Sequence, residues 1–293
     1  MPASQTSAAP AGRDVLAAMT AARCRPHLRS ARIQQALMRS ACLLCLALLV
    51  AFVLAVVGSC VRYVPAATFV TTLFSEEILF AIRLSLATTA ASTGAAMLIG
   101  IPAAYALSRY RFRGASLADT ILDLPMVFPA VASGFALLLL FGYYLGDELA
   151  AHGWRVPHTQ HGISVAQFFC ALTIAVRTVK AALDSIPARL LDVARTLGSG
   201  EWRVFRRIML PLARNGILAG TIMTWSYALG LFGPIMMFCG ATRMRTEVLP
   251  VSVYLNTAVG DLEEAAAATV ILLAIALGSL LLFRRLGGRG YLM

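Results

Sequence analysis

Residues 192–211 read DVARTLGSGEWRVFRRIMLP. The stretch is amphipathic and basic, and Gly198 and Gly200 interrupt it near its middle. Long apolar segments precede and follow it, whereas its own charges make it too polar to be buried in lipid. A polar hairpin between apolar segments is typical of a loop at the surface of a membrane protein.

The composition indicates that a bilayer is the solvent of most of the 293-residue chain. Hydrophobic residues make up 59% of it and charged residues only 13%, well below the roughly 25% of soluble domains. Six uncharged apolar stretches stand out: 41–61, 84–107, 124–146, 162–176, 215–242 and 265–283. Five are long enough for a helix of about 20 residues that crosses the hydrocarbon. The fourth ends at Arg177, whose side chain we expect to extend toward the interface.

Membrane topology explains the net charge of +11. If the N-terminal end is cytoplasmic, the segments on that side hold 20 of the 25 Lys and Arg residues, as the positive-inside rule requires. A nucleic-acid-binding protein instead gathers its basic residues on one surface, so we expect no nucleic-acid partner. An even number of spans then places the C-terminus in the cytoplasm as well.

We therefore predict an all-α integral membrane protein with six transmembrane helices. Residues 1–40 form a basic cytoplasmic tail that we expect to be disordered or to form a weak surface helix near Ile33–Met38. Residues 41–286 form the transmembrane domain, and 287–293 a short cytoplasmic tail. The apolar run 41–61 is longer than the roughly 7–15 residues of a secretory signal. We expect it to be retained as the first helix.

Between the fourth and fifth spans, the spacing predicts a helix, a tight turn and a second helix. Ser185 and Pro187 are typical of a helix start, and Gly198 of the left-handed residue that follows a helix end. Ser199 is then the expected cap of the second helix, and Pro211 its end. The apolar residues of the first helix fall on one face: Leu190, Val193, Ala194 and Leu197.

The pattern leaves two functions open for this hairpin. A basic amphipathic segment can lie on anionic headgroups. A helix end with small residues, here Ala194 and Gly198, can instead allow a cytoplasmic protein to approach closely. The residues alone do not choose between these two interpretations.

The stretch resembles the EAA loop of binding-protein-dependent ABC importer permeases. That pattern is Glu-Ala-Ala, three residues, Gly, nine residues and Ile-x-Leu-Pro. Its positions are occupied here by Asp192, Val193, Ala194, Gly198, Ile208, Leu210 and Pro211, with Arg195 and Leu197 inside the three-residue gap. Asp for Glu and Val for the first Ala are mild departures.

Other stretches resemble the molybdate and sulfate branch of the same family. They are GIPAAYALSRYRFRG at 100–114, LPMVFPAVASGFALLLLFG at 124–142 and LPVSVYLNTAVGDLEEA at 249–265. The segment GLFGP carries Leu231 where members of that branch often have an acidic residue. Permeases for polyamines, ferric iron or thiamine therefore stay open as alternatives.

The resemblance implies a permease subunit in the bacterial plasma (inner) membrane. It implies a homodimer around a central pathway, two cytoplasmic ABC ATPases and an external substrate-binding protein, with molybdate, tungstate or sulfate as substrate. Asp192 would supply a polar contact at the helix end, Ala194 close packing, Gly198 the turn, and Leu210 with Pro211 the link to the fifth span. Through these residues the loop would couple the permease to ATP hydrolysis.

No chemistry is expected in this chain itself. It lacks G-x-x-x-x-G-K-[ST], so it has no P-loop, and ATP would be used by the partner ATPase. We expect no cofactor, no metal and no enzymatic activity. The histidines of the loop DELAAHGWRVPHTQH at 147–161 lack the spacing of a metal site. Cys42 and Cys45 lie inside the first span, where they serve as small apolar residues.

Three further features are candidates for transport. Prolines in a membrane helix free backbone groups that line a pathway or are buried in protein, which makes pathway lining a hypothesis for the set Pro125, Pro129, Ser133 and Gly134. The GxxxG patterns at 142–146 and 216–220 are candidates for close helix contacts. Arg243 and Arg245 could attract an anion or contact a binding protein, or be ordinary loop charges.

Two rival classes explain the sequence less well. A stand-alone secondary transporter or channel would need ionisable residues within its spans and half-helices at the midplane, and the sequence shows neither clearly. An intramembrane enzyme would need a catalytic set facing inward, and none of the four His residues falls within a span. Neither class accounts for the pattern at 192–211.

Overall fold

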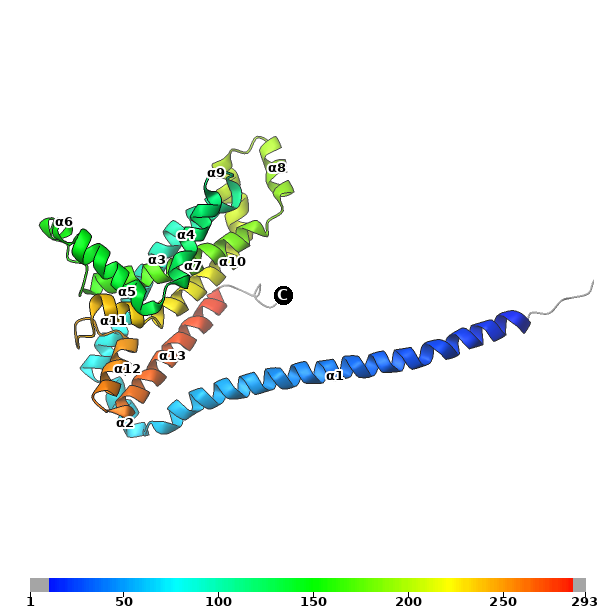
Figure 1. The fold of residues 1–293 in the computed structure, drawn as a ribbon, viewed down its shortest axis with the longest axis horizontal. Coiled ribbons are helices and arrows are strands. Elements are labelled where there is room, and N and C mark those ends of the chain that lie inside the picture. Colours follow the sequence, from blue (N-terminus) through cyan, green and yellow to red (C-terminus); the bar gives the residue numbers. More distant parts are fainter. Residues whose placement is uncertain (1–10, 287–293) are drawn as a thin grey trace, which may run out of the picture. The chain divides into compact units, whose positions relative to one another are not determined.

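The structure is a computed structural model that describes the backbone of residues 11–286 and the side chains of 34–285 except 36 and 284. Every regular element in this part of the chain is helical (Figure 1), which confirms the predicted all-α class. In chain order the elements are α1 (Ala11–Tyr63), α2 (Ala66–Leu73), α3 (Glu76–Arg109), α4 (Ala115–Val127), α5 (Ala130–Leu138), the π-helical turn η1 (Leu139–Tyr144), α6 (Gly146–Ala151), α7 (Gln160–Asp184), α8 (Ala188–Thr196), α9 (Glu201–Val204), the π-helical turn η2 (Phe205–Met209), α10 (Leu210–Leu229), α11 (Gly233–Cys239), α12 (Leu249–Ala258) and α13 (Leu262–Leu286).

The chain divides after Ser59 into two units, and most of α1 forms the first. The part of α1 from Leu37 to Tyr63 is long and apolar enough to cross a membrane. Residues 11–40 also lie in α1, and the cytoplasmic tail stays a prediction. Residues 1–10 and the predicted tail 287–293 lie outside the described residues.

The spans of the second unit are of two kinds. Single helices of sufficient length and apolarity are Glu76–Arg109, Gln160–Asp184 and Leu262–Phe283. Two further segments pass the same test only as pairs of helices with a sharp bend. Ala115–Val127 and Ala130–Tyr144 meet at 109°, and Glu201–Leu229 and Gly233–Cys239 at 57°. The predicted third and fifth spans, 124–146 and 215–242, are therefore not single helices.

Proline and glycine account for both bends. Pro129 forces the preceding residue out of the helical region, and Phe128 is accordingly extended, with φ −63° and ψ 130°. Pro234 lies in the first turn of α11, where its missing N–H costs nothing. The sequence did not show half-helices clearly, whereas the structure breaks two of the predicted spans, after Val127 and after Leu229.

The core of the second unit is a layer of three helices. α3 packs along α7, and α10 packs on both. At the centre, the buried Gln167 of α7 bridges its two neighbours. Its Nε2 donates to the Ala228 carbonyl (3.0 Å) and to Thr89 Oγ1 (3.3 Å), and its Oε1 accepts from Ser92 Oγ (3.3 Å). The Ala228 carbonyl lies at the end of α10, where it also accepts from Leu231 N–H (3.3 Å), so the glutamine adds a side-chain donor at the place where the span breaks.

Small residues allow the helices to approach closely at two places. A Cβ added at Gly216 would lie 2.2 Å from Ala182 Cβ, and one added at Gly134 would lie 2.6 Å from the Pro234 carbonyl oxygen. The first contact joins α10 to α7, so the glycines at 216 and 220 form a helix contact as the pattern indicated. The second joins α5 to α11, which brings the two bent spans together.

We expect Gly216→Ala and Gly134→Ala to destabilise the protein by roughly 1–3 kcal/mol, because overpacking displaces neighbours that cannot rotate away. Gly94→Ala is the control, since nothing lies within 4 Å of its added Cβ. Removing that helix glycine is expected to be neutral or to stabilise by up to about 1 kcal/mol. Thermal unfolding of the purified variants in one detergent measures the difference. Equal midpoints for all three variants would contradict the close approach.

Candidate functional site

The segment after α7 folds into a short helix closed by a left-handed glycine. α7 ends at Asp184, and α8 runs from Ala188 to Thr196. Gly198 has φ +80°, its N–H donates to the Arg195 carbonyl (2.9 Å), and Ser199 N–H donates to the Ala194 carbonyl (3.0 Å). These two bonds form a Schellman motif, which satisfies carbonyls at the helix end. Glycine is favoured here because other residues adopt positive φ only with strain.

Three local predictions around this helix were wrong. Ser185 caps the C-terminus of α7 instead of starting α8, because α7 continues two turns past Arg177. The second helix begins at Glu201 with Gly200 at its N-cap and no side-chain cap from Ser199. Pro211 does not end that helix, since it lies in the first turn of α10 and the helical path is continuous from Glu201 to Leu229. Ahead of this proline the helix widens into η2, with Leu210 N–H bonded to the Phe205 carbonyl, and such a π turn lets a helix pass a residue without a donor.

The apolar residues of α8 are divided between two faces. Leu191 and Ala194 are 2% and 7% exposed and pack in a cluster with Val204 and Met209. Three others, Leu190, Val193 and Leu197, are 50%, 57% and 80% exposed. Part of the predicted stripe therefore packs within the chain, through Ala194, and part forms an open apolar face. Sequence periodicity did not identify Leu191 as the inward anchor, because both faces of α8 are apolar.

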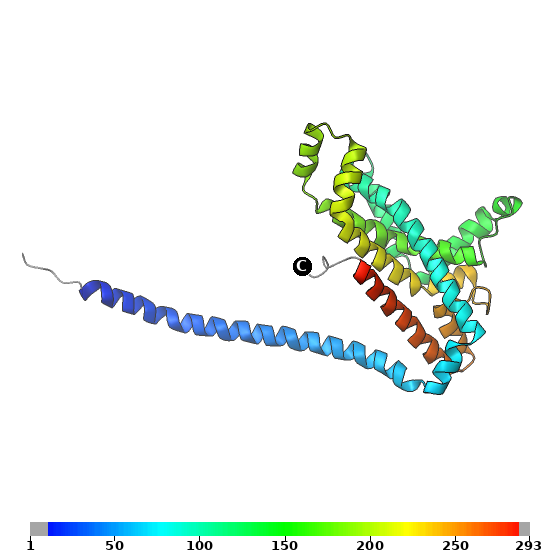
Figure 2. The same ribbon diagram turned by 180° about the vertical axis from the view of Figure 1, so that it is seen from behind.

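The end of α3 holds this segment in place. Arg109 Nη2 donates to the carbonyls of Leu183 (2.5 Å) and Ile186 (3.3 Å), where the chain leaves α7 for α8. Tyr110 donates its hydroxyl to Glu201 Oε2 (3.2 Å). The pKa of Tyr110 is raised, chiefly because its ionisation would place a charge beside Tyr105, so the phenol keeps this proton. Figures 1 and 2 show the α8–α9 turn at one end of the second unit and α2 with α12 at the other.

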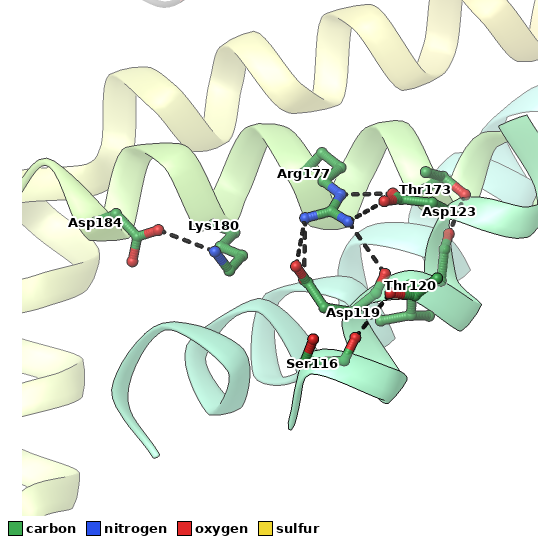
Figure 3. A network of polar contacts seen from close by, with 9 residues as sticks. Ser116, Asp119, Thr120, Asp123, Thr173, Arg177, Lys180 and Asp184 are labelled. Atoms are coloured by element: carbon green, nitrogen blue, oxygen red, sulfur yellow. Dashed lines mark hydrogen bonds and ion pairs between the residues drawn. The ribbon is translucent and has the colours of Figure 1, made fainter. Parts of the chain in front are cut away.

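Arg177 lies at the centre of an ion-pair cluster between α7 and α4 (Figure 3). Its Nε donates to Asp123 Oδ1 (2.6 Å), and its Nη1 to both carboxylate oxygens of Asp119 (3.0 Å each). Its Nη2 donates to the Asp119 backbone carbonyl (3.1 Å) and to Asp123 Oδ2. The prediction that this arginine extends toward the interface did not foresee the two carboxylates. The two aspartates are four residues apart, just before an apolar stretch. This spacing places them on one face of a helix and was the sequence feature that could have indicated the pair.

At the other end of the unit, Arg243 is used within the chain. Its guanidinium pairs with Glu77 at the start of α3 and donates to Asn256 Oδ1 of α12 (2.7 Å). The Arg243 side chain therefore connects the loop after α11 to α3 and α12. The described residues contain no group of His, Cys, Asp and Glu able to hold a metal ion.

The four residues of the pathway hypothesis lie in different environments. Pro129 at the bend is exposed and Pro125 in α4 is half-buried. Ser133 is buried, and its Oγ donates to the Pro129 carbonyl (3.3 Å). Gly134 faces α11. The last two contribute in this structure to helix packing.

Comparison with known proteins gives the family. The model of the "Binding-protein-dependent transport system inner membrane component" family matches residues 96–287. The chain belongs to this family. It is therefore an inner membrane permease subunit of an ABC importer, as the resemblance of 192–211 implied, and the rival classes do not apply.

Curated relatives are about one third identical to this chain over the aligned residues. A "Probable molybdenum ABC transporter permease protein" of Haloferax volcanii is 34% identical over 85% of this chain and 90% of its own length. "Molybdenum transport system permease protein ModB" of Escherichia coli is 34% identical over 69% and 90%. "Sulfate transport system permease protein CysT" of the same species is 34% identical over 63% and 66%.

A solved structure has a similar fold. A chain of a bacterial ABC transporter involved in the import of the acidic polysaccharide alginate superposes with a TM-score of 0.67, over 78% of this chain and 85% of that one. The sequence identity is 18%, so this similarity supports the fold.

We expect Gly198→Ala to loosen α8, because a left-handed alanine costs roughly 1–2 kcal/mol. Gly198→Asn is the matched control, since asparagine tolerates this region better. Hydrogen exchange of the α8 amides in detergent measures the effect, with faster exchange expected for the alanine variant. If both variants exchange as the wild type does, the turn does not depend on its positive φ.

Proposed function

We propose that this permease carries a small oxyanion, molybdate, tungstate or sulfate. The similarity to molybdenum and sulfate transport permeases supports this. The charges of the described spans are compatible with it, because Arg177 pairs with both carboxylates of α4 and offsets part of the negative charge that would repel an anion. Polyamine, ferric iron and thiamine are the alternatives, and cations of this kind would favour free carboxylates along the path.

We propose the assembly of two copies of this chain, two cytoplasmic ABC ATPases and an external substrate-binding protein. A solved alginate transporter is described in complex with a periplasmic protein. ATP would be bound and used by the ATPases, with no cofactor on this chain. Counting each bent pair as one span gives six, which would place both termini and the α8–α9 turn in the cytoplasm.

The observation that supports ATPase coupling is the open apolar face of α8. Leu190, Val193 and Leu197 are exposed on a helix that Leu191 and Ala194 anchor from the other side. An exposed apolar face on a fixed helix suits insertion into a groove of a partner. Asp192 and Arg195 pair with each other beside it (3.4 Å), and Gly198 sets the turn. Ile208, Leu210 and Pro211 lie where η2 enters α10 and would pass the movement on to that span.

The pathway would run along the bent spans. We propose the exposed Pro129 and the half-buried Pro125 as lining residues in this conformation. Ser133 and Gly134 would join them if α5 separates from α11 during transport. The α5–α11 contact would then open and close with the pathway.

We expect Val193→Arg to abolish co-purification of the ATPase, because a charge on the exposed apolar face of α8 would have to enter the partner's groove. The measurement is a pull-down of the tagged chain from gently solubilised native membranes, with stoichiometry by quantitative mass spectrometry. Ala188→Arg is the control, since it adds the same charge to an exposed residue on the opposite side of α8.

One ATPase per wild-type chain, lost with Val193→Arg and kept with Ala188→Arg, supports coupling through α8. A wild-type chain that comes down alone contradicts the proposed assembly. An ATPase that remains bound to Val193→Arg contradicts the role of α8, which would then favour contact with lipid headgroups. A binding protein that co-purifies identifies the substrate through its ligand.

A further inference from the structure

Polar contacts, more than burial, hold α4 in place. No residue of α4 is buried. Among the described residues, every side-chain hydrogen bond between α4 and another helix goes to α7. Arg177 provides five of these bonds, and Thr173 Oγ1 donates the sixth to the Leu122 carbonyl (2.6 Å). The position of α4 therefore depends on one turn of α7.

The cluster spans a full turn of α4 with a single guanidinium. Nε and both Nη atoms of Arg177 are engaged, and Asp119 is bound through its carboxylate and its backbone carbonyl. Bonds of this kind, between ionised donor and acceptor, are short and directional. They fix α4 along its axis as well as across it, which apolar contacts do not do.

α7 connects this cluster directly to α8. Arg177 lies two turns before Asp184, where α7 ends, and only 185–187 separate the two helices. The carbonyls of Leu183 and Ile186 are tied to Arg109, so the connection is held on both sides. A displacement of α8 would therefore be transmitted along α7 to Arg177.

α4 connects the cluster to the pathway. It is the first arm of the bent span, and the bend at Phe128–Pro129 joins it to α5. Gly134 of α5 lies against Pro234 of α11, in the other bent span. A movement of α4 would thus change the bend and, through α5, the contact between the two bent spans.

We propose that the cluster of Arg177, Asp119 and Asp123 transmits the movement of α8 to the bent span, with Arg177 as a positioning residue for transport. This inference rests on the proposed function, because it takes α8 as the ATPase contact. The three side chains are 34%, 33% and 39% exposed. They are therefore not enclosed in the packed core of this chain, so a shift of α4 would not leave a fully buried unpaired charge.

Arg177→Gln tests the proposal, with Lys180→Gln as the matched control. Lys180 lies one turn further along α7 and pairs only with Asp184 of its own helix (3.2 Å), as Figure 3 shows. Both substitutions remove one positive charge, but only the first releases α4. Each is made in a chain whose Cys24, Cys42, Cys45 and Cys60 are replaced by Ser, with Val131→Cys as a reporter at an exposed position of α5.

The readout is the rate at which a thiol reagent modifies this reporter in the complex with its ATPases, with and without ATP in the presence of EDTA. We expect ATP to change the rate in the parent and in Lys180→Gln. In Arg177→Gln we expect the change to shrink about tenfold, within the usual range of coupling between sites, while the ATPases stay bound. An unaltered response in Arg177→Gln overturns the proposal and leaves the proposed function standing.

A charge exchange covers the case in which Arg177→Gln does not fold, because two carboxylates then lack a cation. Arg177→Glu combined with Asp123→Arg keeps the net charge and places the new arginine between two acidic residues. We expect this pair to restore most of the ATP response that Arg177→Glu alone removes. A folded pair without a response overturns the proposal. If the parent complex shows no response to ATP, both the proposed function and this inference fail.

Discussion

Within hydrocarbon no water is available to bond with the backbone, so every break in a membrane helix must be satisfied by protein. Two spans of this permease are broken, after Val127 and after Leu229. The buried Gln167 bonds the Ala228 carbonyl at the second break and ties α7 to α3 on its other side. This one amide therefore adds a donor at the end of α10 and links all three helices of the layer.

The rest of the unit is arranged around that layer by contacts of different kinds. Close packing at Gly216 fixes α10 on α7, and the close approach at Gly134 fixes α5 on α11. Ion pairs hold α4 through Arg177 and the loop after α11 through Arg243. Of these two, α4 has no buried residue, so its position depends most on charged contacts. A packed interior resists continuous deformation, whereas a partly exposed ion pair can exchange partners.

In the loop at 185–211, the proposed function depends on an exposed apolar face of α8. Leu191 and Ala194 use the inner face of α8 to attach it to Val204 and Met209. The outer face of the same helix has no partner among the described residues. The chain belongs to a family of transport-system components, and this face is the one that the proposed ATPase contact would cover.

The sequence by itself determined the solvent, the all-helical class and the family. The length of the apolar stretches and the distribution of arginine are totals over many residues, and the spacing from Asp192 to Pro211 is a local pattern. Both can be recognised without knowing the tertiary structure. It also located the left-handed turn at Gly198, because a glycine after an amphipathic stripe reports backbone conformation directly.

Only the tertiary structure decided where the spans break, which face of α8 is buried, and what Arg177 and Arg243 bind. Pro129 was visible in the sequence, but a proline in a membrane helix either kinks or ends it according to its neighbours. The acidic partners of Arg177 lie 54 and 58 residues away in the sequence, and the acidic partner of Arg243 lies 166 residues away. No periodicity relates positions at such separations, because the pairing is set by how α3, α4 and α7 pack.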